Sequence, residues 1–175
     1  MTGDKMIPAW YVLHTKSRAE SVVHEQLLKK RIEVFLPRII VPSRRKDRKK
    51  MIRMPLFPGY LFVHSDLHPH HHLEIVKTVG AVKLIGDKHG PVNVPDETIA
   101  SLQIMVASEQ PITTGTFFTK GDRVMVVNGP FSGVIGSFER YQGQDRIIVF
   151  IEALGQFAAV EINAEDVERA PAIPA

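Results

Sequence analysis

The stretch Pro55-Leu56-Phe57-Pro58-Gly59-Tyr60-Leu61-Phe62-Val63 combines a turn with a strand. Pro58 fixes the backbone angle φ and Gly59 permits a sharp bend, whereas the four residues that follow favour an extended chain. Side chains alternate along a strand, so Tyr60 and Phe62 point to one face and their neighbours to the other. Two interpretations follow: all these side chains lie in a core, or Phe57, Tyr60 and Phe62 line an apolar pocket.

Composition limits the class of protein. The chain has 175 residues, which is long for one small domain and enough for two, and 44% of them are hydrophobic. It contains no apolar run of about 18 residues and its start lacks the apolar core of a signal peptide. The absence of cysteine excludes disulfides, thiolate metal sites and cysteine nucleophiles. We therefore expect a cytoplasmic protein without membrane contact.

Charge divides the chain into a basic front and an acidic back. Residues 1–108 contain 17 Lys/Arg and 10 Asp/Glu, a net charge of +7, whereas residues 109–175 contain 5 and 9, a net charge of −4. This asymmetry predicts two modules with different partners, of which the basic one faces nucleic acid. The densest basic run is Arg44–Lys50, with Arg53 beyond it, and so many like charges predict a solvated loop or hairpin tip.

The front predicts an α+β domain. Strands are expected at residues 9–15, 34–41, 56–64 and 81–85, with helices from Ser17 to about Lys30 and at residues 69–78. This β-α-β-β-α-β order is typical of the ferredoxin-like split βαβ fold. Ser17-Arg18-Ala19-Glu20 has the form of a capping box. The inward side chains expected on the first helix are Ala19, Val22, Val23, Leu27 and Leu28.

The back predicts a small β-barrel. A third helix opens at Pro95-Asp96-Glu97, and residues 109–119 form a linker with no clear periodicity. Short strands then alternate with glycine turns, at residues 124–127, 134–141, 146–154, 157–162 and near Val167. The expected domains are residues 1–108, a linker over 109–119, and a barrel over 120–170.

These features resemble those of NusG-type transcription elongation factors. The N-terminal domain of that family is matched by Trp10-Tyr11-Val12, by Pro37 and by the stretch from Pro55 to Phe62. The back resembles its KOW domain, an SH3-like barrel, in Gly121-Asp122-Arg123-Val124, in Asn128-Gly129-Pro130-Phe131 and in Gly136. Together the matches cover roughly residues 9–169.

The resemblance implies a non-enzymatic factor that binds the β′ clamp helices of RNA polymerase through an apolar pocket and suppresses pausing or termination. The implied polymerase-binding residues are Trp10, Tyr11, Phe57, Tyr60 and Phe62. In the KOW domain, Phe131 matches a contact residue for a small-subunit ribosomal protein or for Rho; alternatively, it plugs its own barrel. Val134 replaces a second Phe of the family pattern, which argues against Rho.

Two segments resemble specialised paralogues, the UpxY-type and RfaH-like antiterminators, more than the housekeeping factor: the basic run and residues 151–156. The β-prone stretch 146–151 argues against the helical refolding of RfaH-like barrels. We expect the basic residues to contact non-template or upstream DNA. The nucleic-acid candidates are Lys16, Lys29, Arg44, Arg45, Lys46, Arg48, Lys49 and Lys50.

No catalytic motif is recognised, and no cofactor or metal is expected. His-rich tracts can bind metal, but the run from His68 to His72, with His64 before it, has no cysteine to accompany it. The alternatives left open are a housekeeping NusG that also recruits Rho, an RNA- or ribosome-binding KOW protein, and a metal-dependent enzyme built on these histidines.

Overall fold

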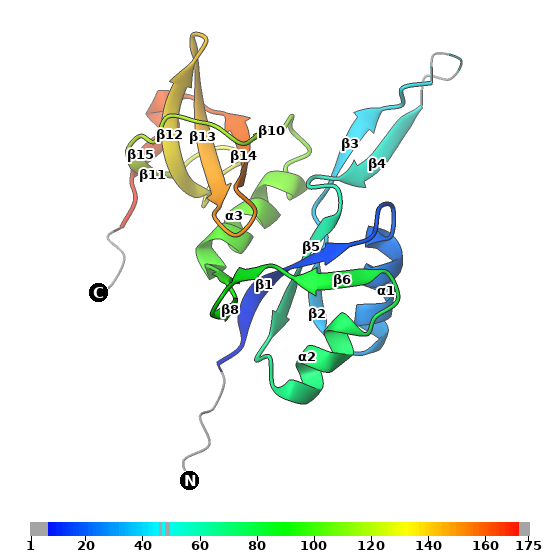
Figure 1. Ribbon diagram of the computed structural model, residues 1–175. Coiled ribbons are helices and arrows are strands. Elements are labelled where there is room, and N and C mark those ends of the chain that lie inside the picture. The colour runs from blue at the N-terminus through cyan, green and yellow to red at the C-terminus, as the bar shows by residue number, and fades with distance from the viewer. Residues whose placement is uncertain (1–6, 46, 48–49, 172–175) are drawn as a thin grey trace. The chain divides into compact units, whose positions relative to one another are not determined.

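The computed structural model describes residues 7–45, 47 and 50–171 (Figure 1). Its contacts divide the chain into two compact units, Met1–Pro95 and Asp96–Ala175, here called the front unit and the back unit. Among the described residues, no helix has the length and apolar character needed to cross a membrane.

The front unit is built on an antiparallel sheet with the strand order β2-β5-β1-β6. The central strands are β1 (Ala9–Thr15) and β5 (Tyr60–Ser65), flanked by β2 (Glu33–Phe35) and β6 (Ala81–Leu84). A short strand, β9 (Asn93–Val94), also pairs with β1. With α1 (Glu20–Lys29) and α2 (Pro69–Val76) as the crossovers, this arrangement confirms the predicted split βαβ fold.

Both helices contribute to one apolar core on the sheet. Val23 and Leu27 of α1 and Ile75 of α2 pack with Leu13 and Leu61 of the central strands, and all five are fully buried. Each such side chain stabilises the fold by about 1.5–3 kcal/mol. The expectation that Val22 and Leu28 also face inward is wrong: they are 52% and 51% exposed. A ten-residue helix turns only a narrow stripe toward the sheet.

The predicted capping box is also wrong. The residue before α1 is Ala19, and no side chain caps the helix. Arg18 has a positive φ of 63°, which is not a helical conformation, so the helix begins after Arg18 and Ser17 lies outside it. Glu20 is instead buried, and its carboxylate accepts a hydrogen bond of 2.7 Å from the backbone N–H of Gly59. The side chain expected to cap its own helix therefore joins that helix to the turn before β5.

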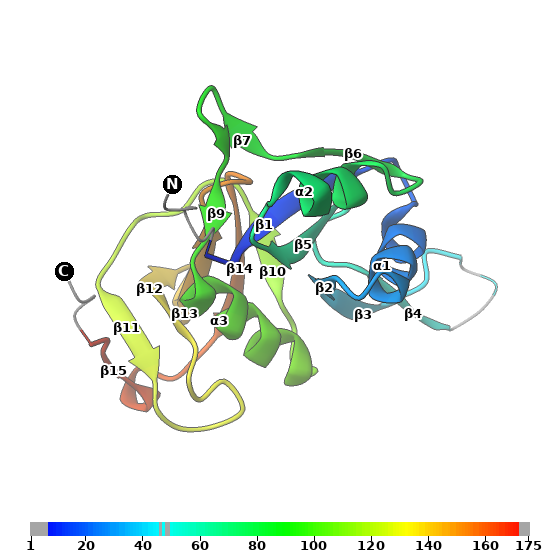
Figure 2. The ribbon, with the colours of Figure 1, turned by 90° about the horizontal axis from the view of Figure 1, so that it is seen from below.

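Residues 34–41 do not form the single strand expected. Pro37 has no N–H to continue a ladder, so the chain leaves the sheet after β2 and begins β3 (Arg38–Pro42). β3 pairs with β4 (Met51–Pro55) as a separate two-stranded ribbon that extends away from the sheet (Figure 1 and Figure 2). A smaller hairpin, β7 (Gly86–Asp87) with β8 (Gly90–Pro91), follows β6.

The back unit is a six-stranded antiparallel sheet of barrel type with the order β10-β14-β13-β12-β11-β15. This confirms the small β-barrel predicted from the glycine-punctuated strands. The strands are β10 (Thr113–Gly115), β11 (Arg123–Val126), β12 (Ile135–Tyr141), β13 (Gln144–Ile151), β14 (Gln156–Glu161) and β15 (Val167–Arg169), with a 3-10 turn at Ala164–Asp166.

The predicted third helix is confirmed as α3 (Asp96–Ala107), and it is joined to the barrel by polar contacts. The buried hydroxyl of Ser101 accepts from the N–H of Ile135 at 3.0 Å and donates to its carbonyl at 3.3 Å. Glu97 forms an ion pair with Arg123. Contacts thus group α3 with the back unit, although the predicted boundary lies at residue 108, and the stretch predicted as a linker carries β10.

Candidate functional site

Aromatic side chains form cross-strand rows on one face of the front sheet. The β1–β5 register sets Trp10 opposite His64, Val12 opposite Phe62, and His14 opposite Tyr60. The rings of Trp10 and His64 lie 5.0 Å apart, and those of His14 and Tyr60 stack at 5.1 Å. Side chains that face each other across an antiparallel pair share one surface, so these residues define the aromatic face.

The middle row of the aromatic face continues onto β2 and the preceding turn. Phe62 stacks on Phe35 with the ring centres 5.9 Å apart, and Phe57 meets Phe62 edge-on at 6.4 Å. Tyr11 points to the opposite face, where it packs against the core beneath the helices. The structure therefore brings together four of the five predicted polymerase-binding residues and leaves Tyr11 on the other side of the sheet.

The rings of Phe57 and Phe62 are buried, with 1% and 0% of their surface exposed, and Trp10 is 8% exposed. Tyr60 and His14 are partly exposed. Phe57 and Phe62 thus lie beneath the surface, and their place in a polymerase-binding pocket stays a prediction. Alternation along β5 predicts correctly which side chains share a face, but burial of that face depends on residues distant in sequence.

The turn before β5 sets the position of Tyr60. Gly59 has a positive φ of 87°, which glycine adopts without strain. Its carbonyl accepts a hydrogen bond of 2.8 Å from the N–H of Thr15, and its own N–H donates to Glu20. The turn is thus held from β1 and from α1 at once, which fixes where β5 begins.

The described residues of the basic run lie at the tip of the β3–β4 ribbon. The N–H of Ser43 donates to the carbonyl of Lys50 at 2.7 Å, which closes the two strands, and Arg44, Arg45 and Lys50 are exposed. Lys46, Arg48 and Lys49, also predicted to bind nucleic acid, lie outside the described residues.

The other two nucleic-acid candidates lie before α1 and at its end. Lys16 precedes the helix and Lys29 is its last residue, and both are exposed. Lys29 ends this ten-residue helix, which is about 15 Å long because each residue adds 1.5 Å. The role of Lys16 and Lys29 in nucleic-acid binding stays a prediction.

The ribbon also exposes apolar side chains that sequence reasoning missed. Ile40, Met51 and Ile52 are 47%, 59% and 39% exposed. Ile40 lies opposite Arg53 and Met51 opposite Pro42, so apolar and basic side chains share the ribbon surface. The sequence shows that residues 38–42 can form a strand. Only the structure shows that this strand pairs with β4 in a separate ribbon and that these apolar side chains are exposed there.

In the back unit, Phe131 is 7% exposed and Val134 is fully buried. Phe131 borders a groove of about 490 Å³, which is also lined by Pro111, Tyr141, Arg146 and Val160. The burial of Phe131 agrees with the alternative in which this side chain plugs the barrel. The exposed part of its ring faces the groove. A role in partner binding stays a prediction.

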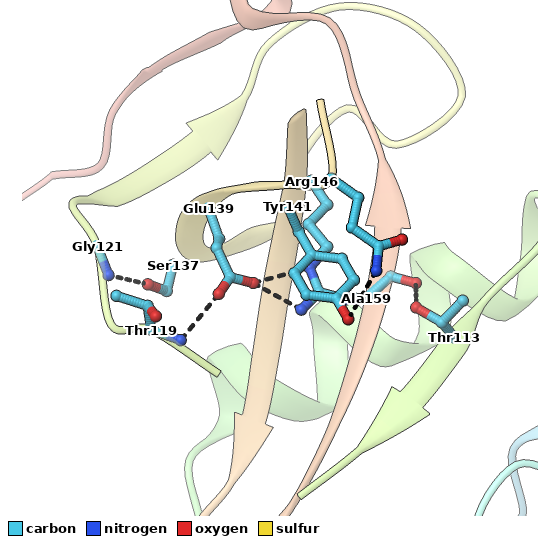
Figure 3. A network of polar contacts seen from close by, with 9 residues as sticks. Thr113, Thr119, Gly121, Ser137, Glu139, Tyr141, Arg146 and Ala159 are labelled. Carbon is cyan, nitrogen blue, oxygen red and sulfur yellow. Dashed lines mark hydrogen bonds and ion pairs between the residues drawn. The ribbon is translucent and has the colours of Figure 1, made fainter. Parts of the chain in front are cut away.

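A buried ion pair holds the segment that enters the barrel (Figure 3). Glu139 is 9% exposed; its carboxylate accepts from Arg146 Nε at 2.8 Å and from the N–H of Thr119 at 2.8 Å. Burial alone raises the pKa of Glu139, but the bonds from Thr119 and Arg146 outweigh it, so this pKa lies below its usual value. The guanidinium of Arg146 also lies 4.3 Å from the ring centre of Tyr141.

The histidines serve local structure. His64 pairs with Glu33 at 2.8 Å, and the ring of His68 accepts from the N–H of His70 at the start of α2. The hydrogen bond from His71, at 2.7 Å, lowers the pKa of Asp66. Within the described part of the chain, no group of three or more His, Cys, Asp or Glu has the geometry of a metal site.

The two units define a class of protein: a ferredoxin-like module with an aromatic face and a basic ribbon, followed by an SH3-like barrel. A family model described as "Transcription termination factor nusG" matches residues 8–103, more than half of the chain. The chain therefore belongs to the NusG family. Members of this family are non-enzymatic transcription factors, and this chain has a role in transcription.

Proteins similar to this chain are named NusG. The transcription termination/antitermination protein NusG of Thermus thermophilus is 28% identical, over 92% of this chain and 98% of its own length. That of Bacillus subtilis is 27% identical, over 91% and 97%. A solved structure of Thermotoga maritima NusG has 22% identity, covers 95% of this chain and 99% of its own, and has a TM-score of 0.48.

Proposed function

We propose that this protein binds RNA polymerase through the aromatic face of the front unit and suppresses pausing or termination during elongation. The observation that carries the proposal is the clustering of Trp10, Phe57, Tyr60 and Phe62 on one sheet face in a chain of the NusG family. Aromatic rings suit a protein contact because they bury a large area at little cost in side-chain entropy. The partner expected is the pair of clamp helices on the β′ subunit.

Tyr60 is the residue on this face that a partner reaches most directly. It is partly exposed, its ring stacks on His14, and the turn at Gly59 fixes its backbone. Phe57 and Phe62 lie beneath the surface, and the N–H of Tyr60 donates a hydrogen bond of 3.0 Å to the carbonyl of Phe57. In this proposal Tyr60 makes the contact, and the buried rings hold its orientation.

Replacing Tyr60 tests this role. We expect Tyr60→Ala to weaken binding to core RNA polymerase by at least about 30-fold, as for a central interface anchor, measured by fluorescence anisotropy with labelled full-length protein. Tyr141→Ala is the matched control, since this tyrosine is 49% exposed and belongs to the back unit. Wild-type affinity in a folded Tyr60→Ala protein would refute the assignment.

The basic ribbon is proposed to contact upstream or non-template DNA beside the polymerase. Support comes from the exposed Arg44, Arg45 and Lys50 at its tip and from the basic charge of the front. For the barrel we propose a small-subunit ribosomal protein as partner, bound through Phe131.

In vitro transcription over a long template, with and without Rho, separates the candidate functions. Faster transcription that depends on Tyr60 supports the elongation role. Increased termination only when Rho is present would favour the housekeeping alternative. Loss of polymerase binding altogether, with RNA or ribosome binding retained, would favour the KOW-only alternative.

A further inference from the structure

Residues 110–115, called the strap, lead from α3 into the barrel and contain β10. Three strap residues pair with residues 157–159 at the edge of β14. The hydroxyl of Thr113 adds a bond of 3.4 Å to the carbonyl of Ala159, which Figure 3 shows. The strap is thus an edge strand of minimal length, a kind of element that opens at low free energy.

The strap borders the groove that leads to Phe131. Gln110, Pro111 and Thr113 form the strap side of this groove of about 490 Å³, and Phe131 and Val160 line it as well. Phe131 is 7% exposed, so a macromolecule that enters this groove has little of its ring to contact. Movement of the strap changes the width of the groove directly.

Close packing determines where the strap lies. A Cβ atom on Gly115 would lie 2.7 Å from the ring of Phe157, closer than such atoms approach, so no larger residue fits without displacement. Further along, the bond from Thr119 to Glu139 anchors the chain where it leaves the strap. The strap therefore packs closely against β14 at Gly115, between α3 on one side and the Thr119–Glu139 bond on the other.

We propose that the strap is an autoinhibitory element that restricts access to Phe131, and that the barrel binds its partner once the strap has left β14. This inference rests on the proposed role of Phe131 in partner binding. Detachment breaks only the short β10–β14 pairing and leaves the Thr119–Glu139 anchor in place. The barrel then has a closed and an open form without unfolding.

Substitution of Gly115 in the full-length protein tests the strap. Gly115→Ala places a Cβ atom against the Phe157 ring, so the strap or this ring must shift. Hydrogen exchange of the Thr113 and Gly115 amides shows whether the strap has left β14, and NMR with the soluble nitroxide TEMPOL reports ring exposure as paramagnetic relaxation. We expect the relaxation of the Phe131 ring protons to rise at least about threefold, as the open form becomes populated. Phe117, 86% exposed, and Phe57, 1% exposed, supply the open and closed reference rings in the same spectra.

Controls separate strap opening from unfolding. Thr116→Ala changes an exposed neighbour of Gly115 and should leave Phe131 protected. Thr113→Gly, which removes the hydroxyl bond and lowers strand propensity, is the milder opening variant. The methyl signals of Ile147, fully buried in the barrel, should stay unaffected in both strap variants.

The proposal is overturned if the amides of Thr113 and Gly115 lose protection from hydrogen exchange while the relaxation of Phe131 stays at the wild-type value. It is also overturned if these amides are already unprotected in the wild-type protein. The experiment measures access and uses no partner. A failure to find a ribosomal partner would therefore count against the proposed function and not against the strap.

Discussion

Glu20 and Phe62 show how single residues acquire roles from their contacts. The carboxylate of Glu20, buried beside the turn, bonds the N–H of Gly59, and Phe62 fills the space between Phe35 and Phe57. A buried polar group must be paired and a buried ring must be packed, so each side chain is sensitive to truncation. Tyr60, two residues from Phe62, is partly exposed and is not sensitive in this way.

This contrast predicts different stabilities for neighbouring alanine variants. Phe62→Ala should lower the free energy of unfolding by about 3–5 kcal/mol because it leaves a cavity at a fully buried site. Tyr60→Ala should cost about 1 kcal/mol, through lost stacking on His14. Urea unfolding followed by the fluorescence of Trp10, the single tryptophan, measures both. Equal losses of unfolding free energy in the two variants would contradict the assigned burial. Phe62→Ala is unsuitable as a test of polymerase binding, because its loss of stability would itself reduce binding.

At the scale of elements, the β12–β13 pair carries the buried ion pair that anchors the entering chain. Glu139 lies opposite Arg146 in the register, and Thr119 joins them from outside the pair. A buried carboxylate without these partners would cost several kcal/mol. The element therefore depends on the charged state of Glu139.

This dependence predicts acid sensitivity of the back unit. The pKa of Glu139 in the folded protein lies below its ordinary value of 4.5, so its stabilisation is fully present above that pH. It is lost as the pH falls through the lower, folded pKa. Urea unfolding followed by NMR signals of β13 at pH 6 and pH 3 should show this loss. Glu139→Gln should flatten the pH dependence and, at pH 6, cost about 1.5–3 kcal/mol.

At the scale of the whole molecule, charge is distributed by module, with +7 over residues 1–108 and −4 over residues 109–175. The ribbon tip concentrates the positive charge of the front at exposed residues. Such a surface attracts phosphates at long range. Its affinity falls as the salt concentration rises, because binding releases counterions and this release is less favourable in concentrated salt. The acidic back lacks this long-range attraction for phosphates.

The salt dependence of DNA binding tests this distribution. The double variant Arg44→Ala/Arg45→Ala of the full-length chain should reduce the log–log salt slope for duplex DNA by about 1.8, because each contacted phosphate contributes about 0.9. Lys77→Ala/Lys88→Ala removes the same charge from exposed sites elsewhere in the front unit. If both variants reduce the slope equally, net charge and not the ribbon explains the binding.

Local sequence pattern by itself determined much of this protein's architecture. Alternation placed Tyr60 and Phe62 on one face, glycine and proline marked the barrel turns, and the order of strands and helices predicted the split βαβ fold. These features depend on residues close in sequence, which is why they can be read from it. The resemblance to the NusG family followed from such motifs.

Tertiary structure alone decided which of these residues are accessible. It buried Phe57 and Phe62, turned Tyr11 to the helical face, drew Glu20 to Gly59 and paired residues 113–115 with β14. Each outcome depends on a contact with a residue distant in the chain. The local sequence pattern does not show which distant residues lie close together in the folded protein. Exposure and pairing are properties of the packed chain, because they depend on which groups exclude water from one another.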